Sequence, residues 1–368
     1  MKRLHRVVAP LLTVGLALAA AFAPIAPADV ERWYSTGAYP AIQRLVTPFS
    51  NLLPFAVLDL LALGGCGVIV AGVVRTVRAA RQTRRIQPIL RAVGDLAAAA
   101  AVVYLAFLVL WGFNYRRMPM TERLLMEPGT PASQAVSDLG VEAATQLNAL
   151  YDEAHRAGWD TAPWEDPTFQ AAFASVQRTL SDAPPATPGR LKRTILGPYF
   201  RWTSVAGMIN PFGLEALANP DLLPFERPFV AAHEWAHLAG YADEAEASFV
   251  GWLACLRADE PARYSGWLFL YSEVNGELDD AGRARLAGAL GAGPRRDIDA
   301  VVDRVRKGQL PWLRTTSWRV YDRYLKANRV EAGVRSYGEV VTLILRARFD
   351  PGWIPVRRAA AAARVPAP

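Results

Sequence analysis

The sequence predicts a mainly α-helical (α+β) protein in which N-terminal transmembrane helices precede a mostly helical domain with a small β element. Hydrophobic residues make up 52% of the 368 residues and the mean hydropathy is positive at +0.11, which is high for a purely soluble protein. Long apolar stretches are confined to residues 1–113, and short amphipathic segments broken by Pro and Gly fill the remainder. A membrane region followed by a globular domain accounts for both observations.

Three apolar stretches in residues 1–113 are long enough to cross a bilayer, at about 7–26, 52–74 and 96–113. The second is interrupted only by Asp59. We therefore expect three transmembrane helices in contact with the lipid bilayer. The first stretch has a second interpretation, because a basic start, an apolar run and an "APA" sequence are also typical of a cleaved secretory signal.

Positive charge is concentrated in this membrane region, which holds 11 Lys and Arg against 4 Asp and Glu, whereas the rest of the chain holds 30 of each. The excess of basic residues therefore belongs to the membrane region, and we expect no nucleic-acid partner. Six arginines and no acidic residue lie at 75–91, so the positive-inside rule predicts that this loop is cytoplasmic. The C-terminal domain is then expected on the extracytoplasmic side of the cell membrane, in a multi-pass protein.

The domain after the third stretch is predicted to extend over residues 114–348. Helical periodicity is visible in "VEAATQLNALYDEAHRAG", "TFQAAFASVQRTLSD", "DDAGRARLAGAL", "RDIDAVVDRVRKG", "SWRVYDRYLKANRV" and "YGEVVTLILRARF". Residues 191–218 combine β-branched and aromatic residues with Pro and Gly, which is typical of one or two strands or a hairpin. Residues 349–368 lack an apolar face, and we predict a flexible tail there.

Several reactive residues have no partner in the sequence pattern. His155 lies in a predicted helix, and we expect a partly buried or solvated side chain. No disulfide is expected, because Cys66 falls in the second apolar stretch and Cys255 in an apolar helical segment. Asp59 is either a functional carboxylate within the membrane or a helix-contact residue, and Asp95 is expected at the membrane interface.

The strongest chemical signal is the motif His233-Glu234-x-x-His237. In a helix, residues four apart project from one face about 6 Å apart along the axis, so the two imidazoles can converge on one Zn²⁺ ion. Glu234 is offset by one residue, which places its carboxylate beside the ion, where it can accept a proton from a zinc-activated water. Glu234 is therefore the predicted catalytic base, and His233 and His237 are predicted metal ligands.

A third protein ligand is needed, because a catalytic zinc site keeps its fourth position for water and substrate. If the helix continued, residue 244 would lie roughly 10 Å beyond His237 along the axis, so the chain must turn back at Gly240. A second helix that begins near Asp243 would then pack beside the first. Asp243, Glu244 and Glu246 are the candidate third ligands.

"HEWAH" resembles the motif of zincin metallopeptidases, and "EAEASF" resembles the ExxA[DN] element of the gluzincins. The resemblance implies a zincin-like domain in which Glu244 is the third zinc ligand, ahead of Glu246 and Asp243. Ser248 stands where the gluzincin element has Asp or Asn, which bears on a partner of the ligands rather than on the metal. A shorter HExxHxxGxxD pattern would nominate Asp243, but no Met-turn signature accompanies it.

The chain as a whole resembles a bacterial membrane-protein family known only as domain of unknown function 3810, with N-terminal spans followed by HExxH. "MINPFGLEALANPDLLPF", "HEWAHLAGYADEAEASFVGWLAC" and "VYDRYLKANRVEAGVRSYGEVV" carry this resemblance. It implies a zinc-dependent hydrolase but names no substrate.

We therefore expect a membrane-anchored zinc metallopeptidase that hydrolyses a peptide or protein substrate. An intramembrane protease is disfavoured, because charged residues flank the motif and no apolar run of spanning length contains it. The alternative is an inactive membrane sensor or scaffold that retains a zinc-binding fold, although a purely structural site would not need Glu234.

Two further features of such an enzyme have candidates in the sequence. The segment 207–220, with Asn210, Glu215 and Asn219, is either an edge that holds an extended peptide or a set of turns. The group that stabilises the developing oxyanion is a choice among Tyr321, Tyr324 and Arg201.

Overall fold

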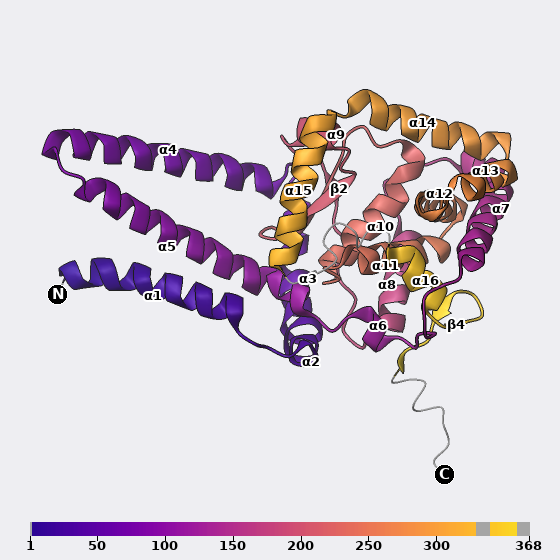
Figure 1. The fold of residues 1–368 in the computed structure, drawn as a ribbon, viewed down its shortest axis with the longest axis horizontal. Coiled ribbons are helices and arrows are strands. Elements are labelled where there is room, and N and C mark those ends of the chain that lie inside the picture. The colour runs from indigo at the N-terminus through magenta and orange to yellow at the C-terminus, as the bar shows by residue number, and fades with distance from the viewer. Residues whose placement is uncertain (1, 329–338, 359–368) are drawn as a thin grey trace, which may run out of the picture.

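The structure, a computed structural model, describes residues 2–328 and 339–358 of the chain. It is mostly helical, with a few short strands, as predicted. Three long helices project from one side of a compact helical body (Figure 1). They are α1 (Lys2–Phe22), α4 (Val57–Thr83) and α5 (Gln87–Leu110).

Two of these helices, α4 and α5, are long and apolar enough to cross a membrane. A third crossing is added if the bent pair of α1 and the helices that follow it is counted as one span, with a bend of 106°. The predicted bounds shift: α1 ends at Phe22, α4 begins five residues later than predicted, at Val57, and α5 begins at Gln87.

The segment between α1 and α4 is helical and belongs to the body of the molecule. It forms α2 (Pro27–Asp29), the π-helix η1 (Val30–Ala38) and α3 (Tyr39–Leu52). One face of α3 carries buried polar side chains that bind the backbone of much later segments. Tyr39 donates a hydrogen bond to the Leu238 carbonyl at 2.8 Å, and Thr47 donates to the Leu214 carbonyl at 2.8 Å.

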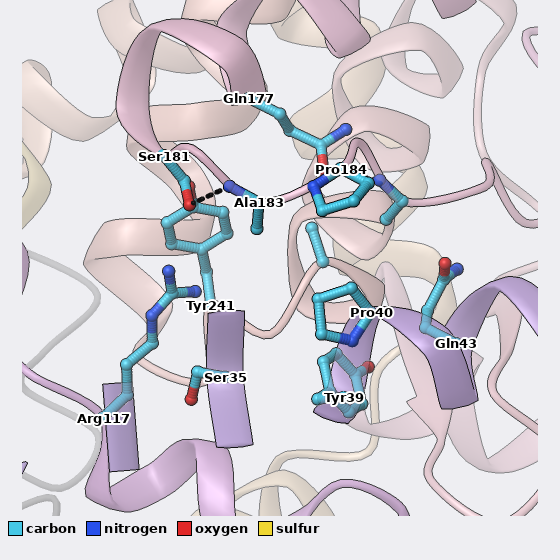
Figure 2. Close-up of a pocket in the computed structure, with 12 residues that line it drawn as sticks. Ser35, Tyr39, Pro40, Gln43, Arg117, Gln177, Ser181, Ala183, Pro184 and Tyr241 are labelled. Atoms are coloured by element: carbon cyan, nitrogen blue, oxygen red, sulfur yellow. Dashed lines mark hydrogen bonds between the residues drawn. The ribbon is translucent and has the colours of Figure 1, made fainter. Parts of the chain in front are cut away.

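A small cavity of about 20 Å³, enough for one water molecule, marks this contact. Figure 2 shows Tyr39, Pro40 and Gln43 on one side of it, and Gln177 and Pro184 on the other. The Gln43 side chain continues the contact, because it donates to the Thr187 carbonyl and accepts from the Thr187 N–H. Residues 30–52 are thus held to the later part of the chain by specific polar contacts.

All six helices predicted from periodicity are confirmed. They are α7 (Ser133–Ala157), α8 (Pro167–Leu180), α13 (Asp280–Ala289), α14 (Ala292–Gly308), α15 (Pro311–Ala327) and α16 (Glu339–Arg346). Residues 329–330 and 337–338 of the last two predicted segments lie outside the described residues. Shorter helices join them: η2 (Gly112–Arg116), α6 (Met120–Arg123), α9 (Gly197–Thr203) and η3 (Pro224–Glu226).

The predicted β element is a three-stranded sheet of β1 (Leu191–Lys192), β2 (Gly207–Asn210) and β3 (Glu215–Ala218). The strand order is β1-β3-β2, with β2 antiparallel and β1 parallel to β3. Within the described parts of the chain, β2 pairs with β3 alone, so it is an edge strand.

The core lies between α10 (Arg227–Leu238), α11 (Glu244–Leu256) and α12 (Glu260–Glu277), the last of which packs against α7. Trp235 and Trp252 are fully buried there. The Trp235 ring packs on Phe169 and Phe173 of α8, with ring centroids 5.3 and 5.4 Å apart. This aromatic packing holds α10 firmly against α8.

The predicted C-terminal tail is structured in its first part. Residues 349–355 form a short hairpin of β4 (Phe349–Asp350) and β5 (Ile354–Pro355). Trp353 at its turn packs on Trp252 and Trp267, with ring centroids 5.1 and 6.1 Å apart. Trp353 was the sequence signal for this hairpin. Residues 359–368 of the predicted tail lie outside the described part of the chain.

Candidate metal centre

The two helices that carry the candidate ligands, α10 and α11, are joined by a tight turn at residues 239–243, as predicted. Gly240 takes a left-handed conformation with φ of +85°, which residues with a side chain rarely adopt. A Cβ there would also lie 2.9 Å from the Asn114 side-chain oxygen. Asp243 then caps α11, and its side chain accepts a hydrogen bond from the Glu246 N–H at 3.1 Å.

This turn brings His233, His237 and Glu244 together. The two Nε2 atoms lie 3.1 Å apart, and Glu244 Oε2 lies 3.3 Å from each of them. His237 and Glu244 are buried, and the His233 side chain is 13% exposed. The three groups form the cluster of possible metal ligands in the described residues.

The spacing of these three atoms fits a zinc ion. Ligands about 2.1 Å from a tetrahedral metal are separated by roughly 3.4 Å, close to the separations in the cluster. Two imidazole nitrogens with one carboxylate oxygen suit zinc better than Mg²⁺ or Ca²⁺, which prefer oxygen ligands. Glu244 Oε2 is buried and has no hydrogen-bond partner in the described part of the chain, as expected for an atom that faces a metal position.

Each candidate ligand is oriented by a further group. The Tyr321 hydroxyl of α15 lies 2.5 Å from Glu244 Oε1, and this bond leaves Oε2 directed at the histidines. His237 Nδ1 lies 2.7 Å from the Tyr241 carbonyl, which can only accept, so Nδ1 carries the hydrogen and Nε2 faces the cluster. Ser248 Oγ lies 3.2 Å from His233 Nδ1, where it can orient that imidazole.

The charges of the cluster act strongly on one another. Burial works to lower the pKa of His237, but the neighbouring Glu244 carboxylate raises it to about 9. Burial works to raise the pKa of Glu244, but the charge of His237 and the contacts with both imidazoles hold it well below its usual range. Burial, reinforced by His237, lowers the pKa of His233. The cluster thus keeps an ionised carboxylate and favours a positive charge beside it.

Glu234, the predicted base, is buried next to this cluster. Burial, with a further contribution from Glu244, raises the pKa of Glu234 to about 8. Within residues 2–328 and 339–358, its Oε2 atom has no hydrogen-bond partner. A Cβ at Gly207 of β2 would lie 2.5 Å from Glu234 Oε1, so only glycine leaves room for this carboxylate at the edge strand.

The other two candidate ligands, Glu246 and Asp243, lie elsewhere. Glu246 accepts hydrogen bonds from the Met120 N–H and from Arg123, the latter at 3.2 Å. Asp243 is occupied as the cap of α11. Both residues therefore have structural roles in which their carboxylates are already bound.

The oxyanion candidates differ in position. Tyr321 reaches the cluster, Tyr324 packs on Phe107 and Tyr115 at centroid distances of 6.5 and 5.9 Å, and Arg201 pairs with Asp221.

The residues of the segment 207–220 also separate. Asn219 accepts from the Asp221 N–H and Asn210 from the Phe212 N–H, so both are turn residues. Glu215 is a buried strand residue instead, paired with Lys192 at 2.8 Å.

The remaining reactive residues lie outside the cluster. His155 is exposed, which agrees with the expected partly buried or solvated side chain, and its Nε2 lies 3.2 Å from Asp297. Cys66 and Cys255 are unpaired. Asp59, at the start of α4, accepts hydrogen bonds from Thr194 and from the Ile195 N–H, which is the helix-contact role.

Two contributors had no clear signal in the sequence. Gly207 lies 27 positions before Glu234, and Trp111 follows α5, far from the motif in sequence. Trp111 Nε1 donates a hydrogen bond to the His237 carbonyl at 2.9 Å. Only the aromatic character of Trp111 at a span end could have suggested a role, and that pattern indicated a membrane anchor.

Comparison with known proteins gives one match. The family described as "Protein of unknown function (DUF3810)" matches residues 34–345, which cover η1 to α16 and include the complete cluster. No curated protein and no solved structure matches the chain. The chain belongs to the DUF3810 family.

Proposed function

We propose that this protein is a membrane-anchored, zinc-dependent metallopeptidase whose catalytic domain lies on the extracytoplasmic side. The observation that carries the proposal is the geometry of His233, His237 and Glu244, whose ligand atoms lie 3.1–3.3 Å apart beside the buried Glu234. The arginine-rich loop between α4 and α5 supports the orientation.

Each residue has a distinct role in this mechanism. His233, His237 and Glu244 would hold Zn²⁺, which when bound supplies a Lewis acid that activates water and polarises the peptide carbonyl. Glu234 accepts the proton of the attacking water and later passes it to the leaving amine. Its position favours this exchange, because it is buried beside the three candidate ligands.

The edge strand β2 favours a peptide as the substrate, because it can pair with an extended chain. Asn219 N–H binds the Ala206 carbonyl, and hydrogen-bonded pairs alternate along an antiparallel ladder. Gly207 and Ile209 therefore direct their N–H and C=O groups away from β3. An extended peptide paired to this edge would pass Glu234 at Gly207, where the missing side chain allows close approach.

The alternative is an inactive sensor or scaffold with a zinc-binding fold. Glu234 argues against it, because a buried carboxylate with an unpaired oxygen costs stability and is not needed to hold a metal. Such a cost is common where a residue serves catalysis.

The test replaces Glu234 with Gln in the full chain, reconstituted in vesicles. Zinc content, measured by metal analysis, should stay at the parental level, and cleavage of mixed peptide libraries should fall by about 10²- to 10⁴-fold. Glu153→Gln, at an exposed position of α7, is the matched control and should cleave at the parental rate.

The same experiment distinguishes enzyme from scaffold. A Glu234→Gln variant that holds zinc and cleaves at the parental rate would show that Glu234 is not the base. Zinc-loaded parent protein with no activity on any peptide, together with a cellular function that survives Glu234→Gln but not His233→Ala, would establish the scaffold.

A further inference from the structure

The candidate metal centre lies directly at the end of a membrane span. Trp111 is the first residue after α5, and it binds the backbone carbonyl of His237. The Trp111 and His237 rings also lie in edge contact, with centroids 6.4 Å apart. No more than one side chain therefore separates the end of α5 from a candidate metal ligand.

A second connection runs from α5 through α15. Phe107, in the last turn of α5, packs on Tyr324 at a centroid distance of 6.5 Å, and Tyr324 stacks on Tyr321 at 6.0 Å. Tyr321 in turn binds Glu244. Figure 1 shows α15 lying across the ends of α4 and α5, nearly at right angles to them. A helix in this position lies along the plane of the membrane surface.

The start of α4 is fixed to the sheet in the same way. Glu215 of β3 accepts hydrogen bonds from the Val57 and Leu58 N–H groups, the first two residues of α4, at 3.0 and 2.8 Å. The first basic residue of α4 is Arg75, 18 residues later, and 18 helical residues span about 27 Å, close to the thickness of the hydrocarbon core. The outer boundary of the bilayer's hydrocarbon core thus lies near Val57.

These contacts orient the edge strand β2 relative to the membrane. Its last residue, Asn210, donates to Glu215 at 2.9 Å and so lies at the start of α4. Its first residue, Gly207, lies against Glu234. Three strand steps separate them, which is about 10 Å. A peptide paired with β2 would have one end at the membrane surface and its scissile bond at Glu234.

We propose that the substrates are membrane-anchored polypeptides, cut in the extended segment roughly three to six residues from the point where the chain leaves the bilayer. This inference rests on the proposed function. An antiparallel arrangement, the more stable per residue, puts the anchor on the N-terminal side of the scissile bond, because β2 runs from Glu234 toward the membrane.

The test uses the zinc-loaded full chain in vesicles of phosphatidylcholine and phosphatidylglycerol. Peptides of one randomised sequence carry an N-terminal palmitoyl chain followed by Gly-Ser spacers of about 2, 6 and 12 residues, and acetylated peptides are the soluble control. Mass spectrometry locates the cut. The cut should stay at roughly three to six residues from the anchor, so it falls in the spacer or in the random sequence according to spacer length.

Cut position is the decisive readout, because anchoring alone concentrates a peptide on the vesicle and raises its rate. Two results would contradict the inference that the substrates are membrane-anchored. One is a cut that stays at one position of the random sequence whatever the spacer length, and the other is soluble peptides that are cut as fast as anchored ones. Either result would leave the proposed peptidase function standing. Absence of cleavage in every format would instead sink the proposed function.

A binding measurement tests the same geometry without turnover. Peptides with a photoreactive residue at graded distances from the palmitoyl anchor are cross-linked to the Glu234→Gln variant, and the labelled residues are mapped. Labelling of β2 should peak when the group lies roughly three to six residues from the anchor. Labelling that does not depend on this distance would contradict the inference.

Discussion

Two buried groups of charged side chains lie at the two ends of β2, and their hydrogen bonding differs. At the start of α4, Glu215 and Lys192 form a pair whose side chains are fully buried. Glu215 also accepts from Asn210 and from two backbone N–H groups of α4, and Lys192 also donates to Ser50. At the candidate metal centre, one oxygen of Glu234 and one of Glu244 have no hydrogen-bond partner among the described residues.

This difference in hydrogen bonding distinguishes the structural contact between β3 and α4, built on Glu215, from a candidate reactive site, built on Glu234. Burial works to raise the pKa of Glu215, but its hydrogen bonds from Lys192, Asn210 and the α4 backbone lower it overall. Burial raises the pKa of Glu234, and the charge of His237 offsets this only in part. A buried carboxylate whose partners are complete stabilises the fold, and one whose partners are missing marks a position reserved for a ligand.

The largest effect on stability is expected at the Glu215–Lys192 pair. Lys192→Met leaves the Glu215 charge buried without its cationic partner and should lower the free energy of unfolding by about 3–5 kcal/mol. Thermal or denaturant unfolding in detergent measures the loss. Lys192→Met combined with Glu215→Gln removes both charges and keeps an acceptor for the α4 N–H groups. This double variant should recover most of the loss, and equal losses in both variants would refute the ion-pair explanation.

Loss of a candidate ligand should act on zinc rather than on the fold. Partners outside the ligand set cost about 10- to 100-fold in metal affinity, so Glu244→Ala should weaken zinc binding by more than about 100-fold. Glu246→Ala is the matched comparison on the same helix and should retain zinc, because Glu246 is bound to Arg123. Equal zinc retention in the two variants, measured by competition with a chelator, would remove Glu244 from the ligand set.

Tyr321→Phe should have a smaller effect on the same measurement. It removes the hydroxyl that binds Glu244 Oε1 but keeps the ring that stacks on Tyr324. Zinc affinity should fall by about 10-fold, the lower part of the range for such partners, with the unfolding temperature nearly unchanged. Tyr324→Phe keeps the same ring contacts and is the control. If Tyr321→Phe loses activity at unchanged zinc affinity, Tyr321 contacts the substrate rather than positioning Glu244.

The smallest expected effect is a gain in stability, whereas Lys192→Met lowers the free energy of unfolding. Glu234→Gln replaces an unpaired buried carboxylate by a neutral amide, so the zinc-free protein should become more stable by about 1 kcal/mol. Glu215→Gln should make it less stable, because the charge of Lys192 is then left unpaired. A Glu234→Gln variant that unfolds at a lower temperature than the parent would show that Glu234 serves the fold.

The sequence predicted what depends on local spacing. The pairing of His233 with His237, the turn at Gly240 and the Asp243 cap follow from helix geometry and capping rules, and the structure brings Glu244 to the histidines as that argument requires. The periodic helices and the hairpin of β2 and β3 are likewise local features.

What could not be predicted depends on contacts between distant segments. α3 has a polar face that resembles a solvated loop until its partners, the carbonyls of Thr187 before β1 and Leu214 before β3, are known. The sequence left Glu215 either in a peptide-binding edge or in a turn, because its partners Lys192 and the start of α4 are remote in sequence. Tyr321 could be ranked with Tyr324 and Arg201 but not chosen, because only the packing of α15 brings it to Glu244.

The contacts of α3 also set an order of events during synthesis. Tyr39 and Thr47 bind carbonyls that lie 199 and 167 residues later in the chain. The polar face of α3 therefore leaves the ribosome long before its partners exist, and contacts of such sequence separation form slowly. Until α10 has been made and has docked, this segment has to stay hydrated beside the membrane, open to proteases and chaperones. Substitutions in α3 should act on the yield of folded protein rather than on the chemistry of the mature site.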